Sequence, residues 1–123
     1  VLASGGANRG HLFKFSHDGG SAGQLLVRLD LPIFDLALDG QGRLWATTGG
    51  GPLVELNPAT GEIAGRYGDG ITQALAVHPG TGKIYVSSGN GIEIFDPASG
   101  KFTHFSDFRV DDQYCTAFRS CLA

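Results

Sequence analysis

The chain has 123 residues, of which 41% are hydrophobic and 17% charged, and its formal net charge is −3. These values are typical of one globular domain with a buried core. The nine Lys and Arg residues are scattered singly, and no apolar run approaches the roughly eighteen residues that cross a bilayer. We therefore expect neither nucleic acid nor a membrane as a partner, because both need features that this composition lacks.

Taken in chain order, the sequence repeats one pattern of short apolar runs. Residues 1–32 predict three strands, close to 1–6, 11–16 and 24–29. Two copies of four strands follow: Phe34–Leu38, Arg43–Thr48, Leu53–Leu56 and Glu62–Tyr67, then Ala74–Val77, Lys83–Ser88, Gly91–Phe95 and Lys101–Phe105. Residues 113–119 match the first strand alone. Each run has four to six residues rich in β-branched and aromatic side chains, which favours strands over helices.

The repeat has a fixed length of 39 residues, which separates Leu36 from Leu75 and Pro58 from Pro97. It divides the chain into a unit without its first strand (1–32), two full units (33–70 and 71–109) and the first strand of a further unit (110–123). A period near forty residues is typical of repeat architectures.

Glycine-rich turns separate the runs, and glycine takes 20 of the 123 positions against a usual share of roughly 7%. Asp39 and His78 begin predicted hairpin turns, and Asn57 and Asp96 begin turns of the form Asn/Asp-Pro-Ala-Thr/Ser-Gly. A turn role accounts fully for Asp39.

Four antiparallel strands per unit, at this period, predict the blade of a β-propeller. The small residues of the first strand suit the crowded innermost position, and Trp45 and Tyr85 suit interfaces between blades. We expect an all-β propeller with three blade-equivalents in this chain.

The same residues carry a resemblance to known families. The runs Gly42–Gly51, Leu53–Ile63 and Gly82–Phe105 resemble the repeats of two-component-regulator propellers and of streptogramin-lyase and NHL-type propellers. The first family implies an extracytoplasmic sensory domain, and the lyases imply metal-assisted elimination with a catalytic histidine and acidic ligands. No such catalytic cluster can be matched in this sequence, and the shared residues are those that make strands and turns.

Three blades do not close a ring, because closed propellers have typically four to eight. One completion is a homodimer in which residues 113–119 of one chain supply the first strand missing from 1–32 of the other, giving a six-bladed ring. The other is the remainder of a longer polypeptide. Both would cover apolar blade faces and strand edges that otherwise invite aggregation.

Polar residues in the channel and in the loops of one face are the candidate ligand-binding residues. Asp35 and Gln73 start innermost strands and are expected to line the channel. The loop candidates are Asn8, Arg9, Asp69, Asn90, Asp107, Asp111 and Asp112. Such loops commonly carry binding residues, so we expect a non-catalytic binding or assembly module. Its ligand is not identified by the sequence, and a small molecule or a glycan is a candidate.

A propeller-type lyase or metal-dependent hydrolase is the alternative, with a divalent ion held in the channel by Asp35. The four histidines show no ligand spacing, and we predict no metal site from them. Cys115 and Cys121 either close a small disulfide loop or remain free thiols. Only the family resemblance bears on localisation, and it points outside the cytoplasm.

Overall fold

The computed structural model describes residues 2–5, 8–15, 23–68, 70–88 and 91–106, and this part of the chain is all-β. Its strands are β1 (Leu2–Gly5), β2 (Asn8–Lys14), β3 (Gln24–Arg28), β4 (Asp35–Leu38), β5 (Leu44–Thr47), β6 (Leu53–Leu56), β7 (Ile63–Tyr67), β8 (Thr72–Val77), β9 (Ile84–Ser88), β10 (Gly91–Asp96) and β11 (Lys101–Ser106). In the second and third units, every predicted strand is present, with its ends shifted by at most two residues.

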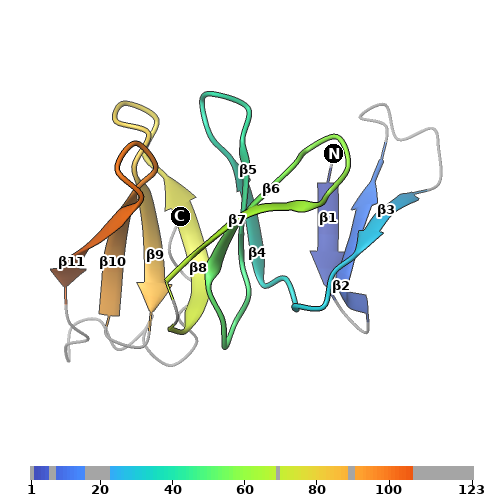
Figure 1. Cartoon of the computed structure of the whole chain (residues 1–123), viewed down its shortest axis with the longest axis horizontal. Coiled ribbons are helices and arrows are strands. Elements are labelled where there is room, and N and C mark those ends of the chain that lie inside the picture. The colour runs from blue at the N-terminus through green and yellow to red at the C-terminus, as the bar shows by residue number, and fades with distance from the viewer. Residues whose placement is uncertain (1, 6–7, 16–22, 69, 89–90, 107–123) are drawn as a thin grey trace.

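The strands form three antiparallel sheets in which sequence neighbours pair. The first sheet has the order β1-β2-β3, the second β4-β5-β6-β7 and the third β8-β9-β10-β11. Figure 1 shows the sheets side by side in chain order, as a row and not as a closed ring. The prediction of four-stranded antiparallel units is thus confirmed for the two full copies.

The turns between the third and fourth strands form as the sequence predicts. The Asn57 side chain accepts a hydrogen bond from the Ala59 amide at 2.8 Å, and the Asp96 side chain accepts one from Ala98 at 3.0 Å. Gly61 and Gly100 end these turns at φ of +76° and +71°, a left-handed conformation that residues with a Cβ rarely adopt.

Each pair of neighbouring sheets encloses its own hydrophobic core. Between the first and second sheets the core is aliphatic, and its buried members are Leu12, Ile33, Leu44, Ala46, Val54 and Leu56. Between the second and third sheets it is built around aromatic rings, and its buried members are Trp45, Leu53, Leu75, Ile84, Val86 and Phe95. The two faces of the second sheet therefore both lie in an interface, which matches the near-continuous burial of β5 and β6.

Trp45 lies between two sheets, as predicted, and only 1% of it is exposed. Its ring centroid lies 5.5 Å from that of Phe95 and 5.9 Å from that of Tyr67. Tyr85, one unit later, lies on the opposite face of the third sheet from this core, where its ring meets Phe105 edge-on at 5.6 Å. Phe105 is 58% exposed, so this face presents apolar surface.

Candidate functional site

The candidate site lies where β4 and β8, the first strands of the second and third sheets, run beside each other. The Asp35 carboxylate joins their edges. Its Oδ1 accepts a hydrogen bond from the Leu36 amide at 2.9 Å, and its Oδ2 accepts one from the Leu75 amide at 3.1 Å. Leu36 and Leu75 are equivalent residues of the repeat, so one side chain caps the same edge position in two successive strands.

A row of threonines continues this contact between the sheets. Gly49 and Thr72 exchange two backbone hydrogen bonds of 2.7 and 2.8 Å. The Thr47 hydroxyl donates to the Gln73 carbonyl at 2.6 Å, and the Thr72 hydroxyl accepts from the Thr48 amide at 3.1 Å while donating to the Gly51 carbonyl at 2.9 Å. Because these groups satisfy one another, the three threonines can be buried at little cost.

The site can still accept hydrogen bonds from a ligand. An ionised carboxylate offers about four lone-pair positions, and the two backbone amides use one on each Asp35 oxygen. Asp35 is half-buried, so the remaining positions are not wholly closed to solvent. The chemistry available there is recognition of a donor, either a hydroxyl or an amine.

Asp35 and Gln73, the two residues predicted from the sequence to line the channel, both take part in the contact between the second and third sheets, which we call the seam. They are not equivalent residues, however, because the 39-residue step from Leu36 to Leu75 makes Ala74 the equivalent of Asp35. In addition, β8 holds one extra residue between Thr72 and Leu75 relative to β9. This irregularity places Gln73 and Ala74 together opposite one residue of the neighbouring strand. Gln73 is half-buried, and its backbone carbonyl is the group that takes part in the seam.

The loop candidates are placed only in part. Asn8 and Arg9 begin β2, at the end of the first sheet that corresponds to the starts of β4 and β8. Asp69, Asn90, Asp107, Asp111 and Asp112 lie outside the described residues, as do Cys115 and Cys121. The loop-face site and the disulfide therefore stay predictions.

Asp39 does more than begin the hairpin turn that the sequence predicts, because it also binds the Trp45 indole. Only 2% of its side chain is exposed. Oδ1 accepts from the Gln41 and Arg43 amides at 2.9 Å, and Oδ2 accepts from Arg43 Nε at 2.7 Å and from Trp45 Nε1 at 3.0 Å. Burial by itself raises the pKa of Asp39, but the hydrogen bonds from Trp45, Arg43 and Gln41 outweigh it and hold the pKa below the usual value of an aspartate.

Asp39 thus fixes the indole at the second interface while it closes the hairpin. The sequence did offer a signal for this contact, because Asp39 lies six residues before the only tryptophan of the chain. The two residues stand on opposite sides of a predicted hairpin turn. His78 takes the corresponding turn position in the next unit, but it is exposed and accepts only from the Gly80 and Thr81 amides, at 3.1 Å each.

The described residues contain no group of three or more His, Cys, Asp and Glu side chains placed to hold a metal ion. Among the histidines, His104 Nδ1 lies 2.8 Å from Glu93 Oε1 across β10 and β11, where it forms a surface pair. Within the described ranges, no helix is long and apolar enough to cross a membrane.

Comparison with known proteins adds a fold-level likeness. No protein-family model matches the chain, and no curated protein matches it. Among solved structures it is similar to the extracellular domain of BT4673 from B. thetaiotaomicron, described as belonging to a one-component system, with 13% sequence identity and a TM-score of 0.59. The match covers 82% of this chain and 15% of that one, so the chain spans a small part of the larger domain.

Proposed function

We propose that this chain is a segment of a β-propeller and serves as a non-catalytic binding or assembly module. The observation that carries the proposal is the Asp35 carboxylate, which holds equivalent positions of two successive first strands, Leu36 and Leu75, side by side. Strands arranged around a common axis bring equivalent positions of successive first strands side by side. The likeness to a much larger extracellular domain also supports the proposal that the chain is a segment of a propeller.

Further sheets complete the arc on both sides in this proposal. The third sheet ends in a face that carries Tyr85, Ile94 and the 58% exposed Phe105. On the far side of the first sheet lie Phe13 and its register partner Leu25, the latter 38% exposed. Each face has the half-apolar character of a surface that a neighbouring sheet covers.

The covering partner that we propose is a second copy of the chain. Residues 113–119 of one copy add to the free edge of β1 in the other and supply the first strand that the first sheet lacks. Two copies then give a six-bladed ring with two-fold symmetry. The alternative is that further blades of one longer polypeptide complete the ring, which would fit the small share of BT4673 that is covered.

The ligand of this module is a small molecule or glycan bound at the contact between β4 and β8 where Asp35 lies, together with the loops at the same end. A hydroxyl-rich ligand suits a carboxylate with unused lone pairs flanked by backbone amides. An extracytoplasmic location is part of the proposal, and it rests on the family-like repeats and on the resemblance to an extracellular domain.

The first test is the solution mass, measured by light scattering at several concentrations. A dimer has twice the 12.9 kDa mass of the chain, and we expect it to persist on dilution. Thr116→Pro removes an amide from the exchanged segment and should yield monomers, whereas Ser120→Pro, just beyond it, should leave the dimer intact. A monomeric wild-type chain would refute the exchange and leave the longer polypeptide as the completion.

The ligand is tested separately, by titration with a panel of mono- and oligosaccharides and with Ca²⁺. Binding of a sugar that Asp35→Ala abolishes supports the module. Binding of Ca²⁺ that depends on Asp35, without any sugar, contradicts it and favours the metal-dependent enzyme class.

A further inference from the structure

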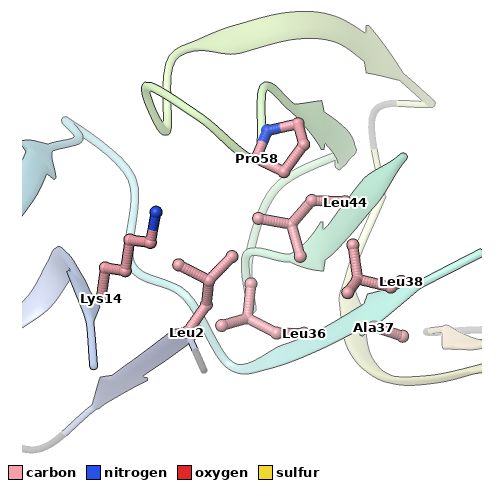
Figure 2. Close-up of a pocket in the computed structure, with 7 residues that line it drawn as sticks. All are labelled: Leu2, Lys14, Leu36, Ala37, Leu38, Leu44 and Pro58. Carbon is pink, nitrogen blue, oxygen red and sulfur yellow. The ribbon is translucent and has the colours of Figure 1, made fainter. Parts of the chain in front are cut away.

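An apolar hollow of about 350 Å³ lies between the first and second sheets, away from the Asp35 site. Its lining residues are Leu2, Lys14, Leu36, Ala37, Leu38, Leu44 and Pro58. Figure 2 shows Leu2, Leu36 and Leu44 around its middle, Pro58 above them, and the Lys14 amine at the side opposite Leu38. Lys14 is the one charged residue of this lining, and it is exposed.

The repeat identifies what the hollow corresponds to. Leu2 is paired with Lys14 in the first sheet as Trp45 is paired with Glu55 in the second. On the opposite wall, Leu36, Leu38, Leu44 and Pro58 correspond to Leu75, Val77, Ile84 and Pro97 of the next unit. The hollow therefore lies at the place that the indole of Trp45 fills between the second and third sheets.

The neighbouring side chains do not make up for the missing ring. Phe95 and Phe102, which pack around Trp45 at the second interface, correspond to Leu56 and Ile63 at the first. The effect is visible at the rim: Leu38 is 58% exposed, whereas Val77, its equivalent, is half-buried against the aromatic core. Apolar walls that lack their filling group bind an apolar guest of matching shape.

The charge beside the hollow is also changed in sign. At the second interface Glu55 lies next to the indole, and at the first interface Lys14 takes its place. A flexible amine at the rim of an apolar hollow favours an anion, which it can reach while its stem packs on apolar surface.

We propose that the hollow binds a small planar aromatic carboxylate, with its ring in the position of the Trp45 indole and its carboxylate paired with Lys14 Nζ. This site is distinct from the ligand site at Asp35 and does not depend on ring closure. A strand added to β1 would not occupy it, because Ala37 and Trp45 lie side by side as strand partners at the second interface.

Titration of the full chain with indole-3-acetate, followed by NMR shifts of the Leu2, Leu36 and Leu44 methyl groups, tests the proposal. We expect saturable binding at micromolar to millimolar concentration, with the shifts confined to the hollow. Leu2→Trp restores the ring that the repeat predicts and should weaken binding by more than tenfold. Leu25→Trp is the matched control, because Leu25 lies on the other face of the first sheet, and it should leave binding unchanged.

The role of the charge has its own variant, which keeps the proposal testable if Leu2→Trp fails to fold. Wild-type protein should bind indole-3-acetate more tightly than tryptamine, and Lys14→Glu should reverse that order. No saturable binding, equal binding to Leu2→Trp and wild type, or an unchanged order of ligands in Lys14→Glu would each overturn the proposal.

Discussion

Replacement of Asp39 by Ala removes the acceptor for four hydrogen bonds at once. The costly loss is Trp45 Nε1, because Trp45 is 1% exposed and a buried donor without a partner costs about 1–3 kcal/mol. The turn amides and the partly exposed Arg43 can turn to water, and each of these bonds contributes about 0.5–1 kcal/mol. We expect Asp39→Ala to lower the free energy of unfolding by roughly 3–6 kcal/mol in total.

The assay is urea unfolding followed by the fluorescence of Trp45, the only tryptophan of the chain. His78→Ala is the matched control, because His78 holds the same turn position but accepts only two exposed amides. That variant should lose less than about 1 kcal/mol. In a Trp45→Phe background, with unfolding followed by circular dichroism, Asp39→Ala should cost about 1–2 kcal/mol less. The reasoning is refuted if Asp39→Ala costs no more than His78→Ala.

Acid gives an independent check on the same carboxylate. The pKa of Asp39 is lowered on folding, so the unfolded chain binds this proton more readily than the folded chain does. The stabilisation is therefore complete at neutral pH and is lost as pH falls from about 4 through the folded pKa. Asp39→Asn should flatten this part of the stability profile relative to wild type, and a profile as steep as that of wild type would contradict the assignment.

Two further predictions concern the other contacts between sheets. Asp35→Ala should speed hydrogen exchange at the Leu75 amide and lower stability by about 1–2 kcal/mol, and unchanged protection of that amide by NMR would argue against the shared cap. Gly61→Ala adds a Cβ 2.6 Å from Val27 Cγ1, whereas Gly100→Ala, at nearly the same φ, meets nothing within 4 Å. Urea unfolding should therefore show a cost of about 1 kcal/mol for Gly100→Ala and 1–3 kcal/mol more for Gly61→Ala, and equal costs would refute the close packing at Gly61.

The strands could be predicted because their signal is local. Runs such as Leu53–Leu56 and Ile84–Ser88 combine β-branched residues with flanking turns, and these preferences act over a few residues. The interface position of Trp45 could be predicted from the same pattern, because a large apolar side chain on a strand between two sheets is buried in the interface between them.

The contacts between sheets were harder to predict, since they depend on register. One extra residue in β8 puts Gln73 and Ala74 together opposite a single residue of β9, and nothing in the composition of that strand predicts this irregularity. The bond from Leu75 to Asp35 joins residues forty positions apart. Asp39 reads as a turn residue because its backbone role is visible in the sequence, whereas its contact with the Trp45 indole requires the hairpin to be folded.

The two interfaces also differ in how firmly they couple their sheets. The second combines packed aromatic rings with hydrogen bonds that Asp35 accepts and that Thr47 and Thr72 make, while the first is aliphatic and contains the hollow. In an array where each unit contacts only its neighbours, the strength of each interface decides whether the two units beside it unfold together. The second and third sheets should therefore unfold together, and the first sheet should open by itself at a lower free energy. The chain is, in this sense, a two-sheet cooperative block carrying one more loosely held sheet.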